Sequence, residues 1–289
     1  MSEKTSLHLA ISTTRQLQET DPRWFEKIFF GYPFCLELKD NPLSAPESLE
    51  LALRNFPEKQ KIILNTPIRP LENQLPLVSS LLEKARELGL SGVCLNSIGM
   101  IEWVKSQFHE LEIYLDGFAN LYTRYDLELV KELGVKGVVP APEIDLTERS
   151  GLLSQEIEII TPIQGNLPLA FSRYCFFYPQ APQSCPNPCR DAHILSYPQG
   201  KIRQMGKALF SEQNLCLLPH ISGLQKKGFH SLRIEGWIMT PEQINRSGEV
   251  YRRALGCEVT ENPPDWPELF PEGFCNGFYF AARGADFIP

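Results

Sequence analysis

The sequence lacks both a surplus of basic residues and a long apolar run. Its 28 Lys and Arg residues are outnumbered by 35 Asp and Glu residues, which gives a formal net charge of −7. Because proteins that grip a phosphate backbone usually carry a basic stripe, this charge disfavours nucleic acid as a partner. No stretch approaches the roughly 18–20 consecutive apolar residues of a membrane span, and no apolar signal core follows the polar start of the chain. We therefore expect a cytoplasmic protein without a membrane anchor.

Several catalytic fingerprints are also missing. The chain has no G-x-G-x-x-G and no G-x-x-x-x-G-K-[ST] motif, so nothing in it supports a nucleotide cofactor. It has neither an H-E-x-x-H zinc motif nor a G-x-S-x-G nucleophile elbow. The sequence therefore shows no readable nucleophile–base pair, and hydrolysis of peptide bonds is a disfavoured activity.

The regular feature of the chain is an alternation of short apolar segments with amphipathic ones. With 289 residues and 43% hydrophobic content, the chain can bury a large core. Strands are predicted at 7–12, 27–31, 61–65, 92–96, 112–116, 136–140, 156–161 with a continuation at 167–171, and 230–235. Helices are predicted at 14–26, 44–56, 75–88, 100–108, 124–133, 222–227 and 242–255. This alternation favours an α/β fold, a (β/α)8 TIM-barrel-like arrangement with a parallel sheet.

Two regions depart from this alternation. We expect a single barrel-like domain over 1–289 that carries a cysteine-rich cluster loop at 172–200 and an irregular C-terminal arm at 258–289. Between the loop and the last strand, 207–218 is predicted to form a hairpin.

The cysteine-rich loop predicts a metal site. Cys175, Cys185 and Cys189 fall within fifteen residues, among prolines that prevent a helix or a central strand. Thiolates suit zinc and iron–sulfur clusters, and a closed site needs about four ligands, so one must come from elsewhere in the chain. Buried apolar thiols or a disulfide are the alternatives, and a cytosolic compartment disfavours the disulfide.

Cys35 is the preferred fourth ligand. It follows the predicted strand 27–31, and α/β proteins place their chemistry beyond the carboxyl ends of their strands. Cys275 is the rival for this position. Cys94 and Cys216 lie inside apolar strands, and we expect them in the core.

Four polar residues are candidates for chemistry beside the cysteines. Glu143 and Asn120 lie beyond predicted strand ends, where an acid or an amide can face a substrate, although a solvated loop position explains them equally well. Arg233 and Glu235 alternate onto one face of the last strand. A carboxylate facing inward there needs a partner, and Arg233 is the candidate for it, or else a ligand of an anionic substrate.

Segments spread over most of the chain resemble a known family. HSLRIEGW (230–237) followed by EVYRRALG (249–256) is similar to the "IEGR … YR" signature of the collagenase-like peptidases, peptidase family U32. Within that family, IFFGYPFC (28–35), LPLAFSRYC (167–175) and FCNGFYF (274–280) resemble most closely the V-type subunits of the UbiU–UbiV pair, from oxygen-independent ubiquinone biosynthesis. Trp237 stands where the family signature has arginine.

The resemblance implies a cofactor, a reaction and a partner. It implies a [4Fe–4S] cluster held by Cys35, Cys175, Cys185 and Cys189, with zinc as the alternative metal. It implies oxygen-independent hydroxylation of an aromatic substrate, such as a ubiquinone precursor, by an enzyme or enzyme subunit that pairs with a sister U-type chain. An RNA-base hydroxylase of the same family, a U32-type peptidase and a non-catalytic scaffold built on the metal are the alternatives.

Overall fold

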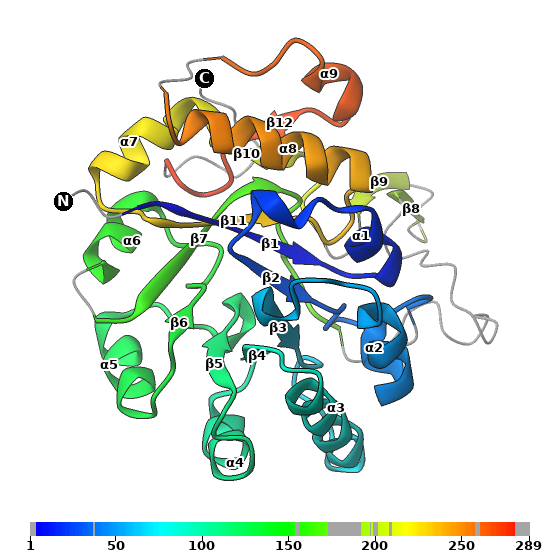
Figure 1. Ribbon diagram of the computed structural model, residues 1–289. Helices are drawn as coiled ribbons and strands as arrows, with labels where there is room; N and C mark the ends of the chain where they lie inside the picture. The colour runs from blue at the N-terminus through cyan, green and yellow to red at the C-terminus, as the bar shows by residue number, and fades with distance from the viewer. Residues whose placement is uncertain are drawn as a thin grey trace.

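The computed structural model describes residues 4–36, 38–153, 156–172, 192–196, 198, 202–207, 210–257 and 261–280, and for 192–196 and 202–207 it describes the backbone alone. Within these residues strands and helices alternate along the chain, and the strands wrap around a closed barrel (Figure 1).

Eight parallel strands close the barrel in the described part of the chain. They are β1 (Ser6–Ile11), β2 (Lys27–Phe30), β3 (Ile62–Asn65), β4 (Gly92–Leu95), β5 (Glu112–Leu115), β6 (Gly137–Val138), β7 (Glu158–Gly165) and β11 (Ser231–Glu235). The first seven pair in chain order, and β11 lies between β1 and β7, parallel to both. Their short apolar sequences suit strands that are buried on both faces. The predicted (β/α)8 TIM-barrel-like fold is confirmed.

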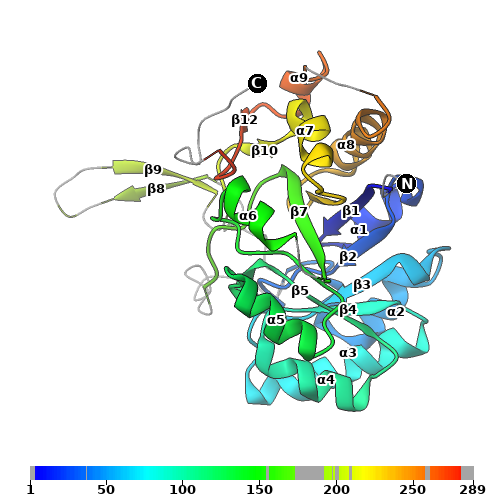
Figure 2. The same cartoon turned by 90° about the vertical axis from the view of Figure 1, so that its left-hand side faces the viewer.

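Helices surround the barrel and cover its outer face (Figure 2). They are α1 (Thr14–Glu19), α2 (Pro46–Leu53), α3 (Leu75–Glu87), α4 (Ile101–Gln107), α5 (Arg124–Glu132), α6 (Leu146–Leu152), α7 (Ile221–Lys226) and α8 (Pro241–Ala254). Capping boxes start several of them: at α8, for example, the Thr240 side chain accepts from the Gln243 N–H, and the Gln243 side chain bonds back to the Thr240 backbone.

The local predictions were wrong at two helices. Ser44 does not cap α2, because it closes a short 3₁₀ turn and Ala45 takes the cap position without a side-chain bond. Helix α6 lies where the sequence analysis placed no helix. Asp145 starts it with a capping box, accepting from the backbone N–H groups of Thr147 and Glu148.

The predicted hairpin at 207–218 is also wrong. The backbone of β9 (Ile202–Lys207) pairs with β8 (Ala192–Ser196), whereas β10 (Asn214–Cys216) runs antiparallel to β7 and parallel to β12 (Phe274–Cys275). The amide of Asn166 bonds the carbonyl oxygens of 211–213, so the chain turns there and returns along β7. The predicted strand at 167–171 is reduced to one bridge, between Pro168 and Phe210.

Side chains divide into an outer and an inner core. The larger core lies between the barrel and its helices. The inner one fills the barrel with alternate residues of the strands, among them Ala10, Phe29, Ile63, Tyr114 and Ile160. The interior of the barrel is therefore packed with side chains below its carboxyl-terminal end.

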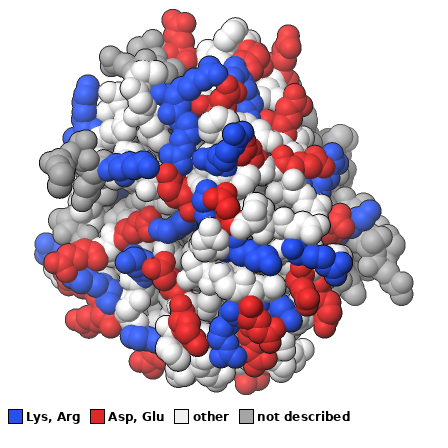
Figure 3. Space-filling model, viewed as in Figure 1, with Lys and Arg blue, Asp and Glu red and all other residues white. Residues whose placement is uncertain are grey.

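The surface shows charges of both signs interspersed on the face in Figure 3. Much of this charge is paired: on α8, Arg246 contacts Asp265 and Glu249, and Arg252 contacts Glu26. No helix in the described ranges combines the length and apolar character needed to cross a bilayer.

Gly165, at the end of β7, tests how tightly the strand ends are packed. Its φ is +111°, and an added Cβ would lie 2.2 Å from the Glu235 carbonyl oxygen. We expect Gly165→Ala to lower the free energy of unfolding by about 3 kcal/mol or more, measured by urea unfolding. Gly89→Ala is the control, because Gly89 has φ +72° but no atom within 4 Å of an added Cβ, so that only strain of about 1 kcal/mol is expected. Equal losses in the two variants would contradict the close contact.

Candidate functional site

A buried ion network spans the interior of the barrel near its carboxyl-terminal end. Arg233, on β11, donates from Nη1 and Nη2 to the two carboxylate oxygens of Asp116 at 3.0 and 2.9 Å, and from Nε to Glu235 Oε1 at 2.7 Å. Arg233 is 1% exposed and Glu235 is 0% exposed. Such planar, paired contacts fix the guanidinium in one orientation.

A bulge in β7 lies beside this network. The register between β11 and β7 shifts between Arg233 and Ile234, opposite Pro162 and Gln164. Proline removes a ladder donor, and bulges re-aim neighbouring side chains, so Pro162 is tolerated at this position. Gln164 then accepts a hydrogen bond from the Tyr251 hydroxyl at 3.0 Å.

Two members of the network, Arg233 and Glu235, have a pKa above its ordinary value. Burial alone would lower the pKa of Arg233, but attraction to Asp116 and Glu235 outweighs it and holds that pKa above its ordinary value. Burial raises the pKa of Glu235 against the opposing effect of Arg233. Both Glu235 oxygens nevertheless accept hydrogen bonds, from Arg233 and from Trp237 Nε1 at 2.6 Å, which is the pattern of an ionised carboxylate.

Aromatic rings cover the network at the barrel mouth. The ring of Phe34 lies 5.1–5.8 Å, centroid to centroid, from the rings of Tyr32, Phe118, Phe210 and Trp237. We call this group with Phe171, whose ring lies 6.5 Å from that of Phe118, the aromatic mouth. Tyr32, Phe34, Phe210 and Trp237 are buried and keep water from the ions below, whereas Phe118 and Phe171 are half-buried.

Cys35 lies at the edge of the aromatic mouth. It is half-buried and packs against the inner core beside Phe34. Asn41 holds the loop that carries it: the Asn41 amide donates to the carbonyls of Cys35 and Tyr32 at 3.0 Å, and its oxygen accepts from the Tyr32 N–H at 3.1 Å. These hydrogen bonds therefore hold the backbone in place on both sides of Phe34.

The structure brings only some of the predicted site residues together. Arg233 and Glu235 form the pair expected from their alternation, and Cys35 lies above them at the mouth. Glu143 and Asn120 are exposed outside the barrel; Glu143 accepts a hydrogen bond from the Tyr122 hydroxyl, which raises the pKa of Tyr122.

The remaining cysteines contribute little to the described site. Cys175, Cys185 and Cys189 lie outside the described residues. Cys275 is buried on β12, and Cys94 and Cys216 lie in the core as predicted. In the described part of the chain no group of three His, Cys, Asp or Glu side chains could hold a metal.

Asp116 and Asn41 belong to the site, although the sequence pattern did not predict them as site residues. Asp116 follows β5 directly, and its carboxylate also accepts from the Gly117 N–H at 2.7 Å, which fixes it at the mouth. A polar residue directly after a predicted apolar strand is the signal that marks it. Asn41 lies in an irregular loop, and no periodic pattern identifies it.

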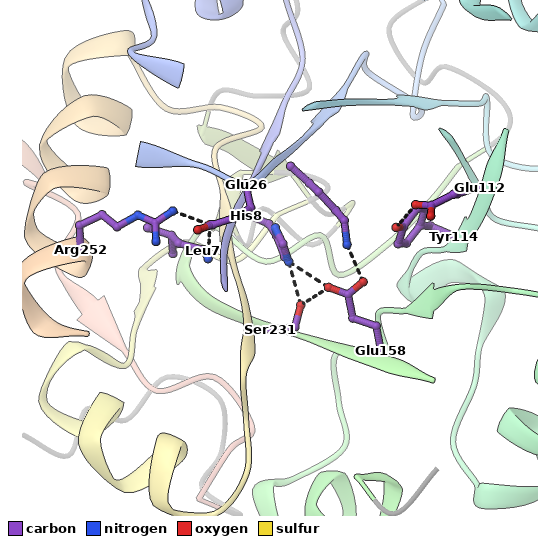
Figure 4. Close-up of polar contacts among 9 residues, drawn as sticks. Leu7, His8, Glu26, Glu112, Tyr114, Glu158, Ser231 and Arg252 are labelled. Atoms are coloured by element: carbon purple, nitrogen blue, oxygen red, sulfur yellow. Dashed lines mark hydrogen bonds and ion pairs between the residues drawn. The ribbon is translucent and has the colours of Figure 1, made fainter. Parts of the chain in front are cut away.

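A second polar cluster lies at the amino-terminal ends of the strands. His8 Nε2 is 2.9 Å from Ser231 Oγ and 3.1 Å from Glu158 Oε1, and Ser231 donates to Glu158 at 2.8 Å (Figure 4). Lys27 Nζ contacts the other Glu158 oxygen at 2.6 Å. In a hydrolytic triad the serine and the carboxylate lie at opposite imidazole nitrogens. Here both face Nε2, so the cluster lacks triad geometry.

Burial and Lys27 determine the charges of this cluster. Burial lowers the pKa of His8, so the imidazole is neutral at neutral pH. Burial alone would raise the pKa of Glu158, but its hydrogen bonds with His8 and Lys27 and the charge of Lys27 outweigh this and lower it.

Comparison with known proteins gives a family match and distant relatives. The family model of peptidase family U32 matches residues 39–286. The chain is similar to tRNA hydroxylation protein P of Helicobacter pylori (strain ATCC 700392 / 26695), 25% identical over 206 residues, 64% of this chain and 48% of that protein. It is also similar to tRNA hydroxylation protein P of Escherichia coli (strain K12), 22% identical over 300 residues, 83% of this chain and 65% of that protein. The chain thus spans about half to two thirds of these relatives.

Solved structures with similar folds are more distant. The U32 peptidase Mk0906 is 15% identical, with a TM-score of 0.43 over 57% of this chain and 71% of that one. A tryptophan synthase α-subunit variant from Pyrococcus furiosus is 13% identical, with a TM-score of 0.45 over 88% of this chain and 98% of that one.

Removal of Arg233 tests the ion network. Arg233→Met leaves Asp116 and Glu235 buried without their cation, and we expect it to lower the free energy of unfolding by about 3–5 kcal/mol at pH 8. The loss should shrink at pH 5, because carboxylates without a cation take up protons more readily. The control is Arg15→Met, which breaks an exposed pair with Glu19 and should change stability by less than about 1 kcal/mol. A loss that is the same at both pH values would argue against the network as drawn.

Replacement of His8 tests the cluster at the amino-terminal ends. Folding lowers the pKa of His8, so below about pH 6.5 the unfolded chain binds a proton more readily than the folded chain does. The free energy of unfolding therefore decreases as the pH is lowered. The loss reaches up to about 1.4 kcal/mol at pH 5.5. His8→Gln should remove this part of the fall between pH 7.5 and 5.5 in urea unfolding. His109→Gln, at an exposed site, should leave it unchanged, and an unaltered fall in His8→Gln would be the contrary result.

Proposed function

Since the chain belongs to peptidase family U32, we propose that it is an iron–sulfur hydroxylase, or the subunit of one, that adds oxygen to an aromatic ring without molecular oxygen. The observation that carries this proposal is the position of Cys35 at the edge of the aromatic mouth, above the buried network of Asp116, Arg233 and Glu235. It places a thiol, a group suited to metal binding, beside aromatic rings at the carboxyl-terminal end of a barrel.

The proposed cluster donors are four cysteines, of which Cys35 alone lies in the described part of the chain. Phe171 packs against the same inner core as Cys35, and Cys175 follows it by four residues, a reach of at most roughly 14 Å. Thiolates suit iron–sulfur centres, and Cys35 with Cys175, Cys185 and Cys189 supplies the four that a cubane takes. A bound cluster would supply or accept electrons at the mouth.

The described residues have separate tasks in this proposal. The buried rings of Phe34 and Trp237 exclude water from the ions, and the half-buried rings of Phe118 and Phe171 contact the aromatic substrate in this proposal. Arg233 is fixed by Asp116 and Glu235, so the charges below the mouth keep one orientation while a ligand binds. Such pre-organised charges need no reorganisation during a reaction. Glu235 holds the Trp237 indole in place through Nε1.

We propose a small aromatic molecule, of the ubiquinone-precursor class, as the substrate, and a sister U-type chain as the partner. The V-type resemblance of 28–35, 167–175 and 274–280 supports this choice, as does the net charge of −7.

A tRNA base is the second candidate substrate. The relatives named tRNA hydroxylation protein P favour it. An RNA base is also a flat ring that can stack on an aromatic mouth. The surface favours it less, because acidic and basic side chains are interspersed on the face in Figure 3.

A peptidase role is disfavoured by the geometry of the described residues. Ser231, His8 and Glu158 are the nucleophile, base and acid types that lie together, but both partners share one imidazole nitrogen at the amino-terminal ends of the strands. TIM barrels work from the opposite end. A scaffold built on zinc remains the non-catalytic alternative, and the metal content separates it from the hydroxylase.

Deletion of the gene tests the reaction and its substrate. After growth without oxygen, we expect the deletion strain to lack a hydroxylated small aromatic product and to accumulate the form that is lighter by one oxygen, as measured by mass spectrometry of extracted quinones and phenols. The wild-type gene should restore the product, and Cys35→Ala should not. Cys257→Ala, at an exposed cysteine, is the matched control and should restore it. Loss of a hydroxylated nucleoside from tRNA, with small molecules unchanged, would replace the first substrate with the second.

A further inference from the structure

Helix α6 carries an arginine in the middle of its apolar face. Leu146, Arg149 and Leu152 are its buried residues, spaced three apart, so they form one stripe against the barrel wall. Arg149 is 0% exposed. The helix lies beside β7 (Figures 1 and 2). Burying a cation in such a stripe costs free energy unless an anion balances its charge and acceptors bind its N–H groups.

The contacts of Arg149 offset only part of that cost. Nη2 donates to the Ala141 carbonyl oxygen at 2.9 Å, and the guanidinium carbon lies 5.0 Å from the centroid of the Tyr279 ring. Nε and Nη1 have no hydrogen-bond partner within the described part of the chain. No carboxylate there forms an ion pair with Arg149, in contrast to Arg233, which contacts two. One N–H on Nε and two on Nη1 are thus unsatisfied.

The surroundings of Arg149 are fixed by the backbone. Ala141 follows β6, and its N–H donates to the Leu121 carbonyl at 3.1 Å. Tyr279 is held at both ends: its hydroxyl donates to the Pro162 carbonyl at 2.6 Å, and its own carbonyl accepts from the Leu146 N–H at 2.9 Å. The guanidinium is therefore enclosed between the β6–α6 loop and the segment around Tyr279, outside the barrel interior.

We propose that Arg149 anchors a binding site for a small oxyanion, a phosphate or carboxylate group, between α6, the β6–α6 loop and Tyr279. Guanidinium N–H groups bind such oxygens with short, charge-assisted hydrogen bonds. One anion would neutralise the buried charge and satisfy Nε and Nη1. The site uses none of the residues of the aromatic mouth, and it does not depend on the hydroxylase proposal.

Thermal unfolding in matched salts tests this site. The wild-type chain, Arg149→Met, Arg149→Lys and Arg54→Met, whose arginine is exposed, are compared in sodium chloride, sodium phosphate and sodium succinate at equal ionic strength. We expect phosphate or succinate to raise the Tm of the wild type and of Arg54→Met by about 2–5 °C over chloride at saturating anion. Arg149→Met should show no rise, and Arg149→Lys, which lacks the Nε donor, a smaller one. An effect of phosphate alone identifies a phosphate group, and of succinate alone a carboxylate.

The same data contain the results that overturn the proposal. A wild-type Tm that is equal in the three salts removes the site. So does an undiminished rise in either Arg149 variant. In chloride, Arg149→Met should unfold at or above the wild-type Tm, because an apolar side chain of similar volume replaces a buried charge that no anion balances. A much lower Tm would mean that the guanidinium is satisfied within the chain, and would also overturn the site.

Discussion

The interior of the barrel depends on one guanidinium. Arg233 is fully enclosed, and it holds two carboxylates from opposite sides of the barrel, Asp116 beyond β5 and Glu235 at the end of β11. A buried ion group of this kind adds little net stability, but it allows one arrangement of its members. That arrangement determines where the Trp237 indole lies, because Glu235 accepts from it, and the ring of Phe34 packs against the indole in turn. The mouth of the barrel is thus built on a rigid, charged base.

The two ends of the barrel use polar groups differently. At the amino-terminal ends, Ser231, Glu158 and Lys27 form hydrogen bonds around Nε2 of a neutral His8, whose Nδ1 has no partner among the described residues. At the carboxyl-terminal ends, aromatic rings and a half-buried thiol lie over the ions, and the chain continues from Phe171 towards its cysteine-rich segment. A half-buried thiol lies beside aromatic rings at the carboxyl-terminal ends, so we propose that the chemistry takes place there.

The sequence predicted the barrel well, because apolar runs and amphipathic helices depend on local periodicity. It also predicted that Arg233 and Glu235 share a face, since alternation along a strand is local. It missed Asp116 as their partner, because that contact joins β5 to β11 across the barrel. Similarly, the hairpin at 207–218 was wrong because side-chain bonds from Asn166 turn the chain there. Contacts of this kind depend on tertiary structure and leave no periodic signal in the sequence.

We propose that Cys35 and the three loop cysteines hold an iron–sulfur cluster at the aromatic mouth. The most direct test is the iron and acid-labile sulfide content of protein purified without air, with its visible spectrum, for the wild type, Cys35→Ala and Cys257→Ala. We expect about four irons and four sulfides per chain and a broad absorbance near ~400 nm that dithionite bleaches. Cys257→Ala should keep these properties and Cys35→Ala should lose them. Zinc without sulfide, or a cluster indifferent to Cys35, would contradict the claim.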